Sequence, residues 1–193
     1  MIIRKVVVLC LRSFISVIYI LGILRANIIR LCNRPFVSVE EMNETIIANW
    51  NAVVFDDDDV YVGGDVCFKS AVEAVKFLKR LRGKKHLIVG NHDNKLLKDP
   101  AFRKMFVEIT DILEVNDNGT RIVISHYPLC EWNGFFRGTL HFYGHIHNNT
   151  ENATYGIMKN ISNAYNIGAD ILGFTPRTLE QVIEMNKRFF EEK

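Results

Sequence analysis

Side chains that can bind a metal ion follow four short apolar runs of this sequence. They combine a carboxylate, an amide oxygen and imidazoles, namely Asp65, Asn91, His126, His145 and His147. Such a set suits a borderline divalent ion such as manganese, iron or zinc, whereas calcium and magnesium favour ligands that are all oxygen. An aspartate that bridges two ions about 3.5–4 Å apart lets them clamp a phosphoryl group and activate water. The residue types therefore indicate a divalent metal centre, in which an aspartate could bridge two ions.

The four runs are typical of β-strands with polar residues at their ends. Each run is rich in β-branched or aromatic residues and closes on glycine or a polar side chain. The runs are VYVGGD at 60–65, HLIVGNHD at 86–93, RIVISH at 121–126 and LHFYGHIH at 140–147. We expect the polar residues at these four strand ends to converge in one cleft.

Helix starts are marked by three capping boxes, in which a hydroxyl covers a free backbone N–H and an acid or amide reaches back. The boxes pair Ser38 with Glu41, Ser70 with Glu73, and Thr178 with Gln181. Apolar residues follow the first two boxes near helical spacing, at Val39, Met42, Ile46 and Trp50 and at Ala71, Val75, Leu78 and Leu81. These helices should cover a sheet face, which favours a layered α/β sandwich with mixed sheets.

Four motifs, in their order and spacing, resemble those of the calcineurin-like metallophosphoesterases. They are Gly64-Asp65, Gly90-Asn91-His92-Asp93, Ser125-His126 and Gly144-His145-Ile146-His147. The flanking segments 27–36, 125–134 and 166–179 resemble the small bacterial and phage branch of that family. The resemblance covers residues 26–193. It implies one domain, an α/β/β/α sandwich of two mixed sheets flanked by helices.

The resemblance also implies which residues hold the metal ions. Asp65 would bridge two divalent ions, which could be manganese, iron, zinc or nickel. Asn91, His126 and His145 would complete the second metal site, and His147 would belong to the first. A hydroxide that bridges the ions would attack phosphorus in line.

Three further residues receive roles around the implied metal centre. His92 would act as general acid and donate a proton to the leaving oxygen. Asp93 would orient His92. Arg34, in the NRPF segment, either helps to hold a phosphate or forms a structural salt bridge. The implied substrate is a small phosphomonoester or phosphodiester, and the sequence does not identify it.

The remaining polar residues have simpler interpretations. His86 and His141 lie outside the implied ligand set and are expected to be structural. Residues 56–59, all aspartate, read as a solvated turn. The cysteines lie far apart without a CxxC pair, which favours reduced and mostly buried thiols at Cys10, Cys32, Cys67 and Cys130.

The first 25 residues depart from the family pattern. The family's first motif, Asp-x-His followed closely by Gly-His, should precede Asn27, but residues 16–23 read SVIYILGI. Only Asp65 and His147 would then serve the first ion, so we expect one ion to bind and activity to be impaired. We treat residues 1–25 as an aberrant apolar segment that contains the first strand.

The genetic code suggests a cause for the missing motif. With suitable third bases, the codons of residues 16–23 read one base earlier encode Ile-Ser-Asp-Ile-His-Phe-Gly-His. Ile18, Ile20 and Ile23 each supply the AT that ends codons for aspartate and histidine. A frameshift or a mis-assigned gene start is therefore favoured over an evolved membrane anchor.

Three functions remain open at this point. The first is a metal-dependent phosphoesterase or its disabled remnant, and the second is a noncatalytic metal-binding or partner-binding domain. The third, a membrane-anchored phosphoesterase, is disfavoured because Arg12 interrupts the apolar run. A formal net charge of +2 gives no signal for nucleic acid. We expect a cytoplasmic protein, and the sequence leaves its oligomeric state open.

Overall fold

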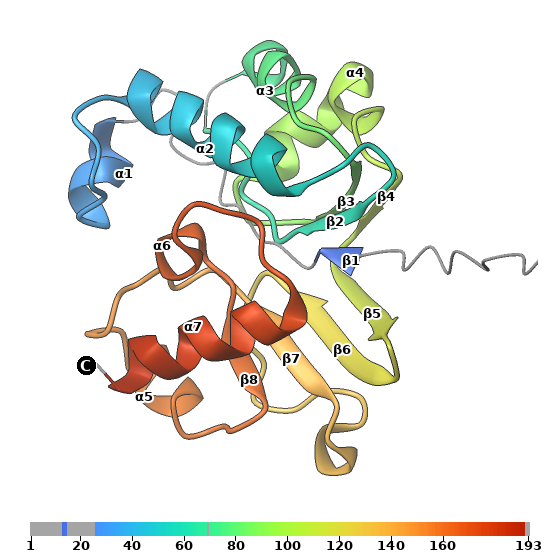
Figure 1. The fold of residues 1–193 in the computed structure, drawn as a ribbon, viewed down its shortest axis with the longest axis vertical. Coiled ribbons are helices and arrows are strands. Elements are labelled where there is room, and N and C mark those ends of the chain that lie inside the picture. Colours follow the sequence, from blue (N-terminus) through green and yellow to red (C-terminus); the bar gives the residue numbers. More distant parts are fainter. Residues whose placement is uncertain (1–12, 15–25, 69, 192–193) are drawn as a thin grey trace, which may run out of the picture.

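The computed structural model describes residues 13–14, 26–68 and 70–191, which form a mixed α/β fold with two four-stranded sheets (Figure 1). The strands are β1 (Ser13–Phe14), β2 (Asp59–Val62), β3 (Lys84–Ile88), β4 (Glu108–Thr110), β5 (Ile112–Asp117), β6 (Thr120–Ser125), β7 (Leu140–Tyr143) and β8 (Ala164–Asn166). The α-helices are α1 (Ala26–Leu31), α2 (Val39–Val53), α3 (Ala71–Leu78), α4 (Pro100–Arg103), α5 (Ala153–Met158), α6 (Ala169–Leu172) and α7 (Leu179–Glu191). Short 3-10 helices cover Asp93–Lys98 and Phe135–Arg137.

The first sheet has the order β1-β2-β3-β4, and all of its described pairs are parallel. We expected a mixed sheet here. It is parallel because helices connect each strand to the next, and such crossovers return the chain in the same direction. Val62 pairs with Leu87, so β2 and β3 end at the same edge of the sheet. The loops that follow these two strands therefore begin side by side.

The second sheet, β5-β6-β7-β8, is mixed as expected. Strand β5 is antiparallel to β6, and a two-residue turn of Asn118 and Gly119 joins them. Both turn residues have positive φ (49° and 94°), the backbone that two-residue hairpins favour. Strands β6, β7 and β8 run parallel, so β6 and β7 also end at a common edge.

The helix caps confirm the predicted starts. Ser38 accepts a hydrogen bond from the backbone N–H of Glu41 (3.0 Å) at the start of α2, and Ser70 accepts one from Glu73 (3.3 Å) at α3. In α2 the predicted stripe is buried. In α3, Leu78 of the predicted stripe is buried with Ala74 and Phe77, Leu81 beyond the helix is also buried, and Ala71 and Val75 pack partly buried against the same core. At α7 the backbone N–H of Thr178 donates to the side chain of Gln181.

Two hydrophobic cores lie on either side of the first sheet. Helices α2, α3 and α4 cover one face, where Trp50, Leu78 and Val62 are fully buried (Figure 1). On the other side, Ile88 of β3 packs in one cluster with Ile124 of β6 and with residues of α6 and α7. The two sheets therefore share a core. This confirms a mixed α/β fold with helices, while the finer sandwich architecture stays a prediction.

A buried polar network ties α7 to β8. The side-chain amide of Asn186 donates to the carbonyl of Asn166 (2.9 Å), and its oxygen accepts from the backbone N–H of Asn166 (2.7 Å). The amide of Asn166 in turn donates to the carbonyl oxygen of His147 (2.7 Å). Asn166 and Asn186 are each only 1% exposed. The position of His147 thus depends on the last helix.

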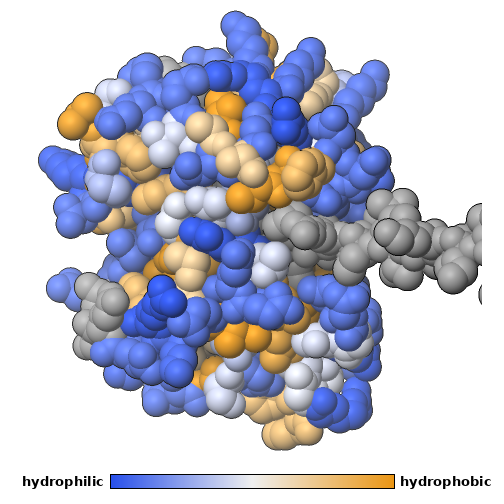
Figure 2. All heavy atoms as spheres, in the orientation of Figure 1, coloured by the Kyte–Doolittle hydropathy of each residue, from blue (hydrophilic) through white to orange (hydrophobic). Residues whose placement is uncertain are grey.

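Much of the expected N-terminal strand lies outside the described residues. Ser13 and Phe14 form β1 and pair with Asp59 and Val60, as a first strand should. Residues 1–12 and 15–25, with the missing motif, are not described. Within the described residues, every helix is too short or too polar to cross a membrane. The face in Figure 2 is mainly hydrophilic, with several small apolar patches.

Candidate metal centre

Four loops bring the predicted ligands together at the ends of β2, β3, β6 and β7. Each loop starts directly after its strand, and each carries at least one of the predicted ligands. Asp65, Asn91 and His145 all lie within a hydrogen-bond or ion-pair distance of His126. Residues from both sheets therefore meet at one imidazole, as the sequence predicted.

His126 is the centre of this cluster and is 1% exposed. Its Nδ1 lies 2.8 Å from the carbonyl oxygen of Gly63, which can only accept, so Nδ1 carries a proton. Burial lowers the pKa of this imidazole, which favours the neutral ring. Nε2 is then a lone pair that faces the rest of the cluster.

The atoms around His126 Nε2 are oxygen and nitrogen atoms of the kind that bind a cation through their lone pairs. Asn91 Oδ1 lies 3.0 Å away, His145 Nδ1 3.2 Å and Asp65 Oδ2 3.6 Å. Two of these atoms are oxygens, which cannot donate to the Nε2 lone pair. Ligand atoms of an ion bound at about 2.0–2.2 Å lie roughly 3.0–3.6 Å apart, and the three distances from Nε2 fall in this range. Asp65, Asn91, His126 and His145 (the four-residue cluster) thus meet at one nitrogen atom, and their role as metal ligands stays a prediction.

Asp65 is held in an uncommon backbone conformation. Its φ is 55°, in the left-handed region that costs a non-glycine residue about 1–2 kcal/mol. Gly64 and Gly90 make this close approach of two loops possible, because a Cβ on Gly64 would lie 2.5 Å from the backbone nitrogen of Gly90. A Cβ on Gly90 would overlap the Asp65 carboxylate. Strain of this kind gathers at functional sites.

Asp93 has a different task from the predicted one. We expected it to orient His92, but its carboxylate accepts backbone N–H bonds from Asp65 (2.7 Å), Val66 (2.7 Å) and Gly90 (2.9 Å). These three bonds join the loops after β2 and β3. Asp93 is 0% exposed, and burial raises its pKa to about 6 although the backbone bonds oppose this. It therefore positions Asp65 through the backbone.

His92 lies in the cleft beside the cluster. Its backbone N–H donates to Asp65 Oδ1 (2.8 Å), and its ring stacks at a tilt on Phe68 with 4.2 Å between the centroids. The backbone bond leaves Asp65 Oδ2 turned toward His126. The imidazole of His92 is exposed within the cleft, a position open to a ligand. Its role as general acid stays a prediction.

His147 belongs to a second group of polar side chains next to the four-residue cluster. Its Nδ1 lies 3.3 Å from Asp170 Oδ2, and ligand atoms of Cys32, His147 and Asp170 all lie within 4.8 Å of one another. Burial alone would lower the pKa of His147, but its hydrogen bonds with Asp170 and Cys32 raise it to about 9. This group (the Cys-His-Asp cluster) could hold a metal ion.

Arg34 is a structural ion-pair residue in this arrangement. Its Nε donates to Asp170 Oδ1 (2.7 Å) and its Nη2 to Oδ2 (3.0 Å), with side chains 0% and 2% exposed. The guanidinium also lies over the ring of Phe174. The paired and buried guanidinium supports the structural role, and the phosphate-binding role stays a prediction.

Two residues of the Cys-His-Asp cluster were missed in the sequence. Asp170 lies in the segment 166–179 without a motif of its own, and Cys32 was interpreted as an inert thiol. One signal was available. A buried arginine at position 34 needs an acid partner, and Asp170 is the only acid between residues 166 and 179. His86 and His141 are structural, as expected. His86 pairs with Asp59 and Glu108, and His141 forms hydrogen bonds with the backbone.

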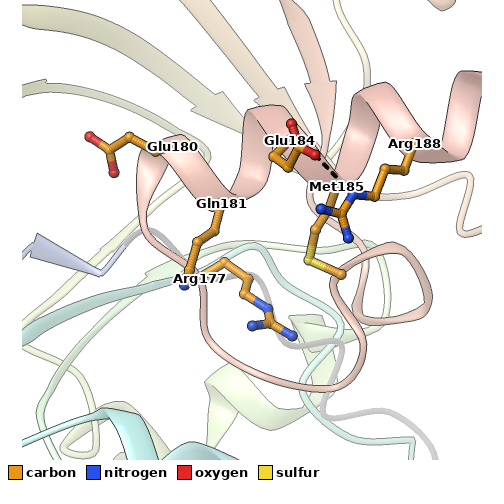
Figure 3. A pocket seen from close by; sticks show the side chains of 6 residues that line it. All are labelled: Arg177, Glu180, Gln181, Glu184, Met185 and Arg188. Carbon is orange, nitrogen blue, oxygen red and sulfur yellow. Dashed lines mark hydrogen bonds and ion pairs between the residues drawn. The ribbon is translucent and has the colours of Figure 1, made fainter.

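A cleft of about 650 Å³ opens beside both clusters, within the usual range for small-molecule sites. His92, His145 and His147 line it, with Cys32 and Phe68. A second hollow of about 340 Å³ lies along α7 (Figure 3). Its charged side chains point outward from the helix and partly pair, as Glu184 does with Arg188 at 2.9 Å. The larger cleft is thus the candidate substrate site.

Fold and clusters together define the class: an α/β protein with a candidate metal centre where the strands of two sheets end. The chain belongs to the family of the uncharacterized protein MJ1445 of Methanocaldococcus jannaschii, with 33% identity over 162 residues, 83% of this chain and 84% of that protein. The Gene 66 protein of Mycobacterium phage L5 is 26% identical over 136 residues, 56% of this chain and 66% of that protein.

A solved structure supports the fold. The protein of unknown function AQ665 from Aquifex aeolicus superposes with a TM-score of 0.69 at 22% sequence identity, over 90% of this chain and 98% of that one. At this identity the likeness concerns the fold alone. No family model matches the chain.

Proposed function

We propose that this protein is a metal-dependent phosphoesterase that hydrolyses a small phosphomonoester or phosphodiester in the cleft beside the four-residue cluster. One observation carries the proposal. Acceptor atoms of Asp65 and Asn91 turn toward the lone pair of His126, whose other nitrogen is bonded to Gly63. A divalent cation at this point would be bound by all of these atoms together, and oxygen and imidazole ligands suit manganese, iron, zinc or nickel.

Each residue of the cleft then has a task. A divalent ion held by the four-residue cluster supplies Lewis-acid activation of water and offsets charge on the phosphoryl oxygens. Asp93 holds Asp65 in place, and Gly63 holds His126 in the tautomer that can bind an ion. His92, stacked on Phe68, is the group we assign to protonate the leaving oxygen.

The substrate is assigned by size rather than by name. The cleft can enclose a ligand of small-molecule size, and its wall combines Phe68 with the amides of Asn149 and Asn152. The oxygens of these two amides accept backbone N–H bonds from Glu151 (3.0 Å) and Thr154 (2.8 Å). Their NH₂ groups are therefore the parts that can donate to a ligand.

We also propose that the protein is located in the cytoplasm.

Metal titration combined with hydrolysis of bis(p-nitrophenyl) phosphate tests the function. The chelator-treated protein should bind manganese or zinc, and turnover should depend on the ion. His126→Ala should weaken binding by more than the roughly 10–100-fold that loss of an outer-shell partner costs, and turnover should fall with it. His86→Gln is the matched control, because His86 pairs with Asp59 and Glu108 away from the cluster.

Two results would decide against the proposal. If His126→Ala and His86→Gln bind metal equally well, the four-residue cluster is not the metal site. If the wild-type protein binds metal but hydrolyses none of a broad panel of phosphoesters, the domain is a noncatalytic metal-binding protein.

A further inference from the structure

We propose that Cys32, His147 and Asp170 form a second metal site, which takes a thiophilic divalent ion such as zinc, cobalt or iron. The site extends the proposed phosphoesterase centre. A role of this site in turnover rests on the proposed function, whereas metal binding at the site does not. It would supply a first-ion site from residues other than an Asp-x-His motif.

The three ligand atoms already lie near a coordination geometry. All are within 4.8 Å of one another. A tetrahedral ion with a sulfur at about 2.3 Å and nitrogen or oxygen at about 2.0–2.2 Å holds its ligand atoms roughly 3.3–3.6 Å apart. His147 Nδ1 and Asp170 Oδ2 are already 3.3 Å apart, and the remaining approach, which side-chain rotations can provide, is at most about 1.5 Å. The fourth position would remain for water or substrate, as in catalytic sites.

Polar bonds from three elements hold the ligands in place. The amide of Asn148 donates to the carbonyl of Cys32 (3.0 Å), which fixes the end of α1 against the loop after β7. Asn166 holds the carbonyl of His147 (2.7 Å), whose φ of 51° lies in the left-handed region. Asp170 stands in the first turn of α6. Such rigid support is what a metal site needs around its ligands.

Arg34 is compatible with an ion at Asp170. It donates one bond to each carboxylate oxygen, which leaves Oδ1 a second lone pair, while Oδ2 also lies 3.3 Å from His147 Nδ1. Carboxylates that bind metals are commonly held by an outer hydrogen-bond donor, and Arg34 would serve as this partner. A thiolate and a carboxylate bring two negative charges, which neutralise a divalent ion. On binding, the thiol of Cys32 and the protonated ring of His147 would each release a proton to solvent.

The site can be reached from solvent and has a clear metal preference. Cys32 and His147 both line the 650 Å³ cleft, so an ion can enter from there. A thiolate selects zinc, cobalt or iron over manganese and magnesium, whereas the oxygen-rich four-residue cluster accepts manganese. The two sites should therefore differ in the ions that they take.

Cobalt titration of the chelator-treated, full-length protein without oxygen tests this site. We expect two equivalents of cobalt and a near-ultraviolet thiolate-to-cobalt band that one of them produces. Cys32→Ser should abolish the band and reduce the stoichiometry to one equivalent. Cys130→Ser, at an exposed thiol, and Cys67→Ala, at a buried one, are the matched controls and should keep the band. Manganese should bind with one equivalent only.

A second measurement needs no variant. Zinc should slow alkylation of Cys32 by roughly tenfold or more, because a metal-bound thiolate is shielded, and should leave Cys130 unchanged. A wild-type protein without the cobalt band, or a band that persists in Cys32→Ser, would overturn the site. Cobalt binding with the band but no hydrolysis of any phosphoester would leave the site standing and remove the proposed function.

Discussion

His141 offers a direct test of how burial controls a histidine in this fold. Its side chain is 0% exposed between two backbone groups. Nδ1 donates to the carbonyl of Val123 (3.1 Å), and Nε2 accepts from the backbone N–H of Leu129 (3.0 Å). Protonation of Nε2 would set two donors against each other and leave a charge in the core. We therefore expect acid to destabilise the protein at this residue.

The magnitude follows from the pKa of His141, which burial lowers to about 4 against a partial opposing effect of the Val123 carbonyl. The unfolded chain takes up this proton near pH 6.5, and the folded protein only near pH 4. The stabilisation is complete above pH 6.5 and is lost progressively as the pH falls toward 4. The shift corresponds to roughly 3 kcal/mol in full, of which about 2 kcal/mol is lost by pH 5.

Urea unfolding of the wild type and of His141→Gln, at pH 7.5 and pH 5 with chelator, measures this effect. Glutamine does not titrate, so the wild-type advantage in unfolding free energy should shrink by about 2 kcal/mol between the two pH values. Comparison of the two proteins cancels the other titrating groups, including Asp93, whose raised pKa acts in the opposite direction. An advantage that stays constant between pH 7.5 and pH 5 would refute the reasoning.

Three further predictions concern the clusters. Gly90→Ala should abolish metal binding by the four-residue cluster, because the added Cβ overlaps Asp65, whereas Gly156→Ala, with open space around it, should bind normally in the same calorimetric titration. Between pH 7.5 and pH 6, metal affinity should fall by less than the roughly tenfold expected for two unperturbed histidine ligands, because burial lowers the pKa values of His126 and His145. A steeper loss of affinity would contradict the conclusion that both rings are buried and neutral. Replacing residues 17–23 by Asp-Ile-His-Phe-Gly-His, with the spacing to Asn27 adjusted, should raise turnover of bis(p-nitrophenyl) phosphate, and unchanged turnover with a second bound ion would count against the phosphoesterase assignment.

Local signals predicted most of the secondary structure. The capping serines and the runs that end at Asp65, Asn91, His126 and His145 depend on neighbours within a few residues, and the strands and helix starts lie where they indicate. Parallel pairing then brings the strand ends together. In α3 the spacing pattern did not identify Ala74 and Phe77, which are buried beside the predicted Leu78.

Contacts between distant residues could not be read in the same way. Arg34 and Asp170 are separated by 136 positions, and only the folded chain shows that they pair. The role of Asp93 was misjudged for a related reason. Its sequence neighbour is His92, but its carboxylate points back to the backbone of the loop after β2. Neighbouring residues in the sequence identified the motif, but only the fold shows which backbone groups the Asp93 carboxylate binds.

The link from Asn186 through Asn166 to the carbonyl of His147 bears on how the protein is made. During synthesis the chain emerges from its N-terminus, and the three ligands of the Cys-His-Asp cluster leave the ribosome before α7 does. The backbone of His147 would lack its final anchor until Asn186 has emerged. We expect ribosome-bound chains that stop before α7 to contain the ligands without the geometry, so metal uptake should be a late event that follows docking of this helix.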